Sequence, residues 1–192
     1  MTNESAGFRI RGMTNISIDP IGIDGAKLTK LTVWQDERGS FFEAFRATWF
    51  AEQRQRWVQW NVSRSTGCVV RGLHFHKLQT DYWHVVAGSL QVALVDLRPR
   101  SPTYKVAKCL TLNADEPQGI YIPPGVLHGY KISKDATIMY LVDVEYTGRD
   151  EFGIRWNDPA LQLPKEWYGG PEPSVSKRDA TAPLLKDAAD RP

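Results

Sequence analysis

The histidines of this chain are concentrated in one short segment. Three of the four lie in RGLHFHKLQTDYWH, residues 71–84, and the fourth, His128, lies in IPPGVLHGY. Histidine is the commonest metal ligand in proteins and also a general base that works near neutral pH. These residues therefore predict a metal site or a metal-free acid–base site, unless they only complete hydrogen bonds within a sheet.

The spacing is compatible with a metal site. His74 and His76 stand two residues apart in a predicted strand, which directs both side chains to one face. Asp81 follows, and His128 comes after a Pro-Gly turn. This order resembles the two short motifs of the cupin superfamily, with Asp where cupins usually have Glu. Three imidazoles and one carboxylate would suit Zn, Fe, Mn or Ni. His84, in the aromatic run DYWH, is explained equally well by packing.

Several short strands are expected around these histidines. Segments 68–75, 89–97, 119–122 and 136–144 are rich in Val, Ile, Leu and aromatic residues, and Gly and Pro clusters separate them. Such strands indicate an all-β sandwich or barrel. A helix is predicted at 48–57 with Thr48 as its N-cap, and segment 182–189 is compatible with a short helix. We expect one domain over 1–192, with a barrel core at about 28–163 and an irregular tail at 164–192.

The composition narrows the class of protein. The 24 basic and 22 acidic residues are interleaved and give a net charge of +2. This balance predicts no nucleic-acid partner and no membrane surface, and no apolar run is long enough to span a bilayer. Cys68 and Cys109 lie in strand-like segments and fit reduced thiols better than a disulfide framework. A cytoplasmic protein with one core is therefore expected.

Six longer strings point to one family. They are DERGSFFEAF (36–45), RGLHFH (71–76), VDLRPRSPTY (95–104), IPPGVLHGY (122–130), GIRWNDPAL (153–161) and SKRDATAPLL (176–185). Together they resemble the dTDP-4-dehydrorhamnose 3,5-epimerase family, from about Leu28 to Leu185. The resemblance implies a cupin jelly-roll barrel, a homodimer, a nucleotide-sugar substrate, and catalysis without a metal or an organic cofactor.

The chemistry of such an epimerase explains its residue types. Protons alpha to the 4-keto group, at C3 and C5, must leave one face of the sugar and return on the other. The reaction needs a base, an opposed acid, and donors that stabilise the enolate oxygen. The resemblance implies that His74 is the base, that Asp179 pairs with it, and that Tyr140 is the proton donor across the ring.

Further matched positions imply ligands of the nucleotide sugar. Arginine suits this role because its planar fork can bind a diphosphate. With His76 as part of the same pocket, the predicted substrate-binding set is Arg38, Glu43, Gln59, Asn61, Arg71, His76, His128, Glu151 and Arg178.

Three departures from the family pattern concern the pocket. The family usually has glutamine at the position of His76, a lysine that helps hold the enolate oxygen near Asp81, and aspartate at Trp60. A metal on His74 would occupy the lone pair that must accept the substrate proton. We therefore expect His76 and Asp81 to reshape the pocket without binding metal, in an enzyme that acts at C5, at C3 or at both. Unless Lys77 or His76 replaces the missing lysine, enolate stabilisation is weaker, which predicts a slow or selective enzyme, such as one that epimerises one carbon rather than two.

Two other functions stay open from the sequence. One is a metal-dependent cupin enzyme that uses His74, His76, Asp81 and His128. The other is a sugar-nucleotide-binding cupin that has lost turnover. The combination of His74, Tyr140 and Asp179 argues against the latter, because a binding protein does not need a base, its partner and an opposed acid.

Overall fold

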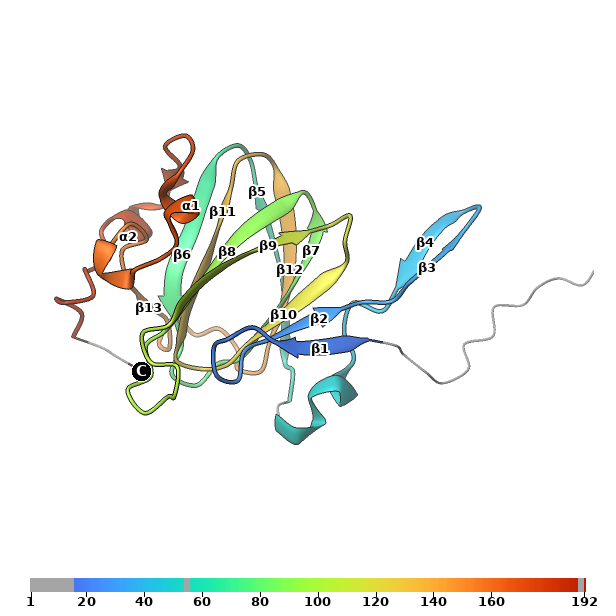
Figure 1. Ribbon diagram of the computed structural model, residues 1–192, viewed down its shortest axis with the longest axis horizontal. Coiled ribbons are helices and arrows are strands. Elements are labelled where there is room, and N and C mark those ends of the chain that lie inside the picture. Colours follow the sequence, from blue (N-terminus) through green and yellow to red (C-terminus); the bar gives the residue numbers. More distant parts are fainter. Residues whose placement is uncertain (1–15, 54–55, 190–191) are drawn as a thin grey trace, which may run out of the picture.

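Two antiparallel sheets face each other and form the body of the protein (Figure 1). The computed structural model describes residues 16–53, 56–189 and 192. In spatial order the first sheet contains β1 (Ser17–Pro20), β2 (Lys27–Lys30), β10 (Gln118–Ile122), β7 (Asp81–Ala87), β12 (Ala136–Val142) and β5 (Gln59–Ser65).

The second sheet receives strands from both the middle and the end of the chain. Its order is β13 (Phe152–Gly153), β6 (Val69–Phe75), β11 (Val126–Ile132), β8 (Ser89–Asp96) and β9 (Ala107–Asn113). A further strand, β14 (Ser174–Val175), pairs in parallel with β6. The cupin jelly-roll expectation is confirmed, and the four predicted strand segments correspond to β6, β8, β10 and β12 within two residues at each end.

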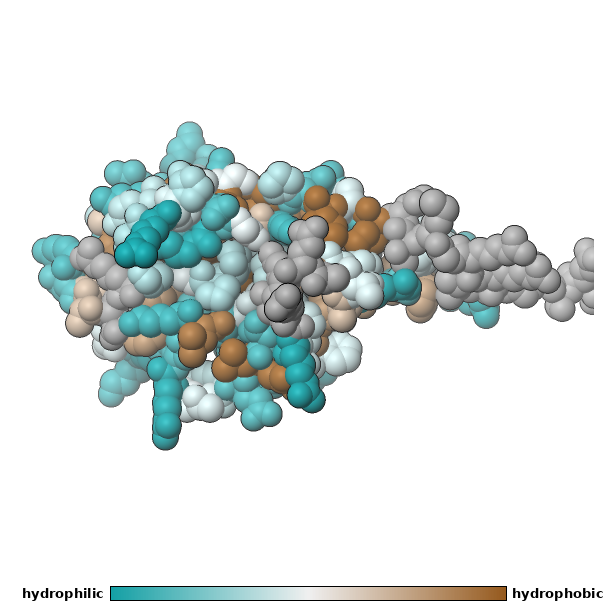
Figure 2. Space-filling view, turned by 90° about the horizontal axis from the view of Figure 1, so that it is seen from below, coloured by the Kyte–Doolittle hydropathy of each residue, from teal (hydrophilic) through white to brown (hydrophobic). Residues whose placement is uncertain are grey.

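The two larger hydrophobic clusters lie on the two faces of the second sheet. Leu90, Val92 and Leu94 of β8 point into the barrel and pack in the first cluster. Ala93 and Val95 point outward and pack in the second. Apolar residues on both faces of a strand require a cover on each side. In the view from below, hydrophobic residues form only small separate groups on a largely hydrophilic face (Figure 2).

The C-terminal segment supplies the outer cover of the second sheet. It contains η2 (Pro159–Leu161), α1 (Lys165–Tyr168) and α2 (Lys177–Ala180), which lie beside β6 (Figure 1). Trp167 is fully buried there, and Lys131 Nζ of β11 donates to Gly169 O at 2.6 Å. The tail therefore holds more regular structure than expected. Segment 182–189 forms no helix: it contains a turn at 185–187 and no other regular structure.

The N-terminal part differs from its prediction in one element. An α-helix was expected at 48–57, but residues 47–53 form the 3-10 helix η1 (Ala47–Gln53), with a kink at Phe50, and Thr48 lies inside it and is not its N-cap. Residues 54–55 of the expected helix lie outside the described residues. The side chain of Phe50 is buried and stacks on Tyr121, 4.8 Å between ring centroids. Before η1, the hairpin of β3 (Val33–Asp36) and β4 (Gly39–Phe42) projects away from the barrel (Figure 1). In the described ranges, no helix has the length and apolar character needed to cross a membrane.

Candidate active site

A cavity of about 740 Å³ lies inside the barrel, between the two sheets. Its size lies within the range of small-ligand pockets. Successive side chains of a strand point to opposite faces, so every second residue of the inner strands lines the cavity. From β5, β7, β11 and β12 these residues are Gln59, Asn61, Ser63, Asp81, Trp83, His128, Tyr130, Ile138, Tyr140 and Val142.

Strand β6 departs from this alternation. Arg71 and His74 both line the cavity although they are three residues apart. The register with β11 shifts between them, because His128 pairs with His74 whereas Tyr130 pairs with Arg71. Gly72 lies at the shift with a φ of +111°, and a Cβ there would meet His128 O at 3.0 Å. Only glycine fits easily at this bulge, which directs Arg71 and His74 to the same side.

His74 and Asp179 form a hydrogen-bonded pair. His74 Nε2 lies 2.8 Å from Asp179 Oδ1, and Gly72 N donates to Asp179 Oδ2 at 3.2 Å. Ser176, the N-cap of α2, accepts a hydrogen bond from Asp179 N and fixes the start of that helix. Because a carboxylate only accepts, we place the imidazole proton on Nε2, which leaves a lone pair on Nδ1.

Arg178 and Glu151 cover the other side of His74. Arg178 forms ion pairs with Glu151 and with Asp179. Its Nη2 also lies 3.0 Å from His74 Nε2. With the imidazole proton on Nε2, both nitrogens are donors, so Arg178 and His74 are in contact there without a hydrogen bond. His74 Nδ1 faces Glu151 Oε1 at 3.4 Å, so a carboxylate lies near each ring nitrogen.

Both carboxyl groups are ionised at neutral pH. Burial raises the pKa of Asp179, but the hydrogen bond and charge of His74, the Gly72 N–H and Arg178 outweigh it and lower the pKa to about 2. Burial likewise raises the pKa of Glu151, and the charges of His74 and Arg178 outweigh it and lower that pKa. The two groups are therefore anions that can stabilise an imidazolium between them.

Tyr140 enters the cavity from the opposite sheet. It belongs to β12 of the first sheet, whereas His74 belongs to β6 of the second, so the two side chains project from facing walls. Burial, then the negative charge of Asp81, raises the pKa of Tyr140. Its hydroxyl therefore keeps its proton at neutral pH and can serve as a donor.

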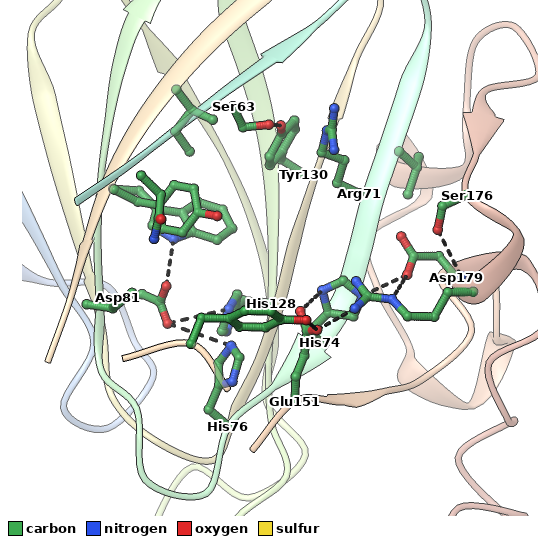
Figure 3. A pocket seen from close by; sticks show the side chains of 18 of the residues that line it. Ser63, Arg71, His74, His76, Asp81, His128, Tyr130, Glu151, Ser176 and Asp179 are labelled. Carbon is green, nitrogen blue, oxygen red and sulfur yellow. Dashed lines mark hydrogen bonds and ion pairs between the residues drawn. The ribbon is translucent and has the colours of Figure 1, made fainter. Parts of the chain in front are cut away.

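A second cluster occupies another part of the cavity wall. His76, Asp81 and His128 place one ligand atom each within 4.8 Å of one another, and all three are buried (Figure 3). Trp83 Nε1 and Gln79 Nε2 donate to the two oxygens of Asp81, at 3.3 and 3.1 Å. The alternative metal-ligand set of the sequence analysis also included His74. That residue lies outside this cluster, because its ring is turned toward Asp179.

Most of the predicted ligands line the cavity, but two do not. Gln59, Asn61, Arg71, His76, His128, Glu151 and Arg178 all contribute to its wall. Arg38 lies on the β3–β4 hairpin and pairs with Asp36, and Glu43 pairs with Arg46. Neither lines the cavity of its own chain. The roles of all nine residues stay predictions.

Sequence reasoning missed several residues of the wall. Trp83 and Tyr130 each follow a predicted residue by two positions, Asp81 and His128, and both face inward. Strand alternation from those two residues would have identified them. Ser174, Val175 and Ser176 also line the cavity, and no sequence pattern indicates the parallel pairing of β14 with β6 that brings them there.

Comparisons with known proteins agree with this geometry. A sequence profile described as dTDP-4-dehydrorhamnose 3,5-epimerase matches residues 20–187. The dTDP-4-dehydrorhamnose 3,5-epimerase of Mycobacterium tuberculosis (strain ATCC 25618 / H37Rv) is 36% identical over 176 residues, which cover 87% of this chain and 86% of that protein. The dTDP-4-dehydrorhamnose 3-epimerase of Streptomyces niveus is 35% identical over 178 residues, with coverages of 89% and 84%.

A solved structure supports the same relationship. The crystal structure of dTDP-6-deoxy-D-glucose-3,5-epimerase from Legionella pneumophila Philadelphia 1, in complex with dTDP-4-keto-L-rhamnose, is similar with a TM-score of 0.83 and 33% identity. The similarity covers 90% of this chain and 94% of that one. The profile, the relatives and the shared fold together establish that the chain belongs to the dTDP-4-dehydrorhamnose 3,5-epimerase family.

Proposed function

We propose that this chain epimerises a dTDP-4-keto-6-deoxyhexose at C5, at C3 or at both, by proton transfer through an enolate. The observation that carries the proposal is the His74–Asp179 pair, which faces a sheet carrying Tyr140 across the cavity. Relatives named as 3,5-epimerase and as 3-epimerase resemble the chain about equally, so either extent of reaction is consistent with the family.

The proposed mechanism assigns one step to each of the three residues. His74 Nδ1 accepts a proton from the carbon next to the keto group, while Asp179 holds the proton on Nε2. The electron pair of the broken C–H bond moves to the keto oxygen, which becomes an enolate. The enolate electron pair then returns to the same carbon, which takes a proton from the Tyr140 hydroxyl on its opposite face. Solvent returns a proton to Tyr140 and takes one from His74. The remaining lining residues bind the sugar and the nucleotide in this proposal, and Arg71 and Arg178 are the two arginines among the described lining residues.

Solvent exchange tests this function directly. The protein is incubated in D2O with dTDP-4-keto-6-deoxyglucose, and deuterium at each sugar carbon is followed by NMR. Deuterium should enter C3, C5 or both, at a rate that requires the protein. Absence of exchange with this substrate and with other dTDP-4-keto-6-deoxyhexoses would contradict the proposal.

We further propose that the protein is a homodimer that buries the outer face of the first sheet. Trp60 and Val62 on edge strand β5 are 63% and 57% exposed, and they pair across the sheet with Leu141 and Met139. Exposed apolar side chains gathered on one sheet face are typical of an interface. Beside this face, Glu43 Oε2 and Trp49 Nε1 are buried without a hydrogen-bond partner in the described chain. A second copy would cover the apolar face, and the projecting β3–β4 hairpin would bring Arg38 toward it.

The cysteines favour a reducing compartment. Cys68 and Cys109 are both free thiols. Burial raises the pKa of Cys109 to about 11, so this thiol is un-ionised and unreactive at neutral pH. We propose a cytoplasmic location on this basis.

A further inference from the structure

The cluster of His76, Asp81 and His128 is unusual in its hydrogen bonding. His76 Nδ1 lies against Asp150 O, and His128 Nδ1 lies 2.8 Å from Val126 O. A carbonyl oxygen only accepts, so each Nδ1 carries a proton. In the neutral form of each ring, the lone pair is then on Nε2. These two nitrogens face Asp81 Oδ2 at 4.0 and 3.9 Å.

Three acceptor atoms therefore converge: Asp81 Oδ2 and the Nε2 atoms of the two histidines. Hydrogen bonds among these three atoms do not explain their arrangement. A hydrogen bond joins two heavy atoms about 2.5–3.2 Å apart. Both histidine–aspartate separations are longer than this, and one added proton could bridge only one of them. All three residues are buried. Asp81 Oδ2 accepts one hydrogen bond, from Gln79 Nε2, and a cation would further stabilise a buried carboxylate that faces two nitrogen lone pairs.

A cation fits the space better than a proton. The two Nε2 atoms lie 3.9 and 4.0 Å from Asp81 Oδ2, and all three ligand atoms lie within 4.8 Å of one another. An ion placed equally far from the three atoms would lie within about 2.5 Å of each. This distance is close to the bond length of about 2.0–2.2 Å between Zn²⁺ and nitrogen or oxygen ligands. A metal-binding histidine usually donates its other ring nitrogen to a backbone carbonyl or a carboxylate, as both histidines do here.

We propose that His76, Asp81 and His128 form a binding site for one divalent transition-metal ion such as Zn²⁺, Fe²⁺ or Mn²⁺. Two imidazoles favour these ions over Mg²⁺ and Ca²⁺. The three ligands line the cavity wall, so the remaining coordination positions of the ion face the cavity. This reverses the expectation that His76 and Asp81 bind no metal. That expectation assumed that the metal would bind His74. The His74 ring lies instead against Asp179 (Figure 3), and in the tautomer placed above its Nδ1 keeps its lone pair.

The role of the ion rests on the proposed function, whereas its binding does not. An enolate oxygen needs positive charge or hydrogen-bond donors nearby. The Asp81 carboxylate alone would repel that oxygen, and none of the described residues that line the cavity is a lysine. A bound divalent ion can accept an electron pair from the keto oxygen and stabilise the enolate. The substrate proton still goes to His74, and no oxidation or reduction takes place.

Titration with single metals tests the binding. Protein is purified, stripped with a chelator, and titrated with Zn²⁺, Mn²⁺ and Co²⁺ in separate calorimetric experiments, with the visible spectrum of the Co²⁺ complex as a second readout. We expect one ion per chain for at least one metal. His76→Gln and Asp81→Asn should each weaken that binding by at least about a hundredfold. His84→Gln is the matched control, because His84 is a buried histidine of β7 that does not line this cavity.

The outcomes separate binding, role and function. Absence of one-to-one binding by wild type, or unchanged affinity in folded His76→Gln and Asp81→Asn, would overturn the site. His74→Ala should bind metal like wild type, and loss of its binding would show that the ligand set is wrong. If metal binds but solvent exchange is the same with and without it, the site stands and its role in the reaction falls. If metal binds and no exchange occurs in any metal form, the site stands and the proposed function fails.

Discussion

His74 and Asp179 lie 105 residues apart in the sequence, yet their side chains meet at 2.8 Å. Strand β14 runs beside β6 and places α2 against it, so that Asp179 reaches the ring from the C-terminal segment. The same carboxylate receives the Gly72 N–H from the bulge that turns Arg71 inward. The proposed base and its partner are therefore held by the barrel and the tail together, and neither part alone forms the pair.

Replacing His74 by Ala should abolish exchange of the sugar protons with solvent. General acid–base groups contribute about a hundred- to ten-thousand-fold to a rate, so the remaining exchange should fall by at least about a hundredfold. NMR of the substrate in D2O measures it. The control is His84→Gln, on the same barrel but outside the cavity, which should exchange like wild type. Near-normal exchange in His74→Ala would mean that another group is the base.

Replacing Tyr140 by Phe should separate the two halves of the reaction. Proton removal by His74 does not need the hydroxyl, so exchange at the substrate carbon should continue. Reprotonation on the opposite face should fail, and epimer formation should fall by about a hundredfold relative to exchange. The ratio of epimer formed to deuterium incorporated gives the result.

Tyr130→Phe is the matched control for this ratio. Tyr130 also lines the cavity, but its hydroxyl lies 3.2 Å from both Ser63 Oγ and Ser65 Oγ. Because those serines already engage it, removal of this hydroxyl should leave the ratio unchanged. An equal loss of epimer in both variants would assign the donor role to neither tyrosine.

The barrel could be predicted from the sequence because its signals are local. Runs of β-branched and aromatic residues between Gly and Pro turns identified the four expected strands. The helix at 48–57 was wrong in type, because packing of Phe50 on Tyr121 accompanies a kink that a regular α-helix would not have. The predicted irregularity of the tail overlooked β14, whose two residues carry no strand pattern and depend on pairing with β6.

The site was harder to predict than the fold because contacts between segments distant in sequence orient its histidines. Alternation placed His74 and His76 on one face, but β6 ends at Phe75, and interactions at each ring decide where the two histidines point. His74 is held by a carboxylate from the tail, and His76 by the backbone of Asp150. Both contacts join segments more than 70 residues apart in sequence, so spacing alone could not divide the histidines into a pair and a cluster.

Replacing Asp179 by Asn should affect both stability and chemistry. The pKa of Asp179 is lowered from 3.8 to about 2, so its ionised form stabilises the folded state above about pH 4, and this stability is lost as pH falls toward 2. Asp179→Asn should lower the free energy of unfolding near pH 7 by about 2 kcal/mol and flatten its decline below pH 4. Urea unfolding at several pH values measures both effects, and solvent exchange should fall in parallel with that of His74→Ala.

Asp96→Asn distinguishes chemistry from stability. The pKa of Asp96 is also lowered to about 2, because Arg98, Ser101 and Thr103 outweigh the effect of its burial. Asp96 lies outside the cavity, and its replacement should cost about 3 kcal/mol because a buried charged pair is broken. Exchange should persist in this variant at temperatures where it is folded. Equal loss of exchange in both aspartate variants would mean that the Asp179 effect is only structural.

Replacing Trp60 by Glu should dissociate the proposed dimer. The indole is 63% exposed on edge strand β5, next to Leu141 across the sheet, so in a single chain it contributes little to the core. Within an interface, a central aromatic residue typically contributes about 2 kcal/mol or more, which is at least about a thirtyfold change in the dissociation constant. A buried glutamate would add a desolvation cost. Sedimentation velocity over a range of concentrations should show a dimer for wild type and a monomer for Trp60→Glu, with unchanged circular dichroism.

Tyr104→Glu tests whether this change is specific to the sheet face. Tyr104 is 38% exposed in the loop between β8 and β9, on the other sheet, so it does not lie on the proposed interface. The same added charge there should leave the dimer intact. A wild-type monomer, or a Trp60→Glu dimer as tight as wild type, would exclude this face as the interface. Because Arg38 and Glu43 lie outside the cavity of their own chain, that result would also remove the reason to expect them near a substrate.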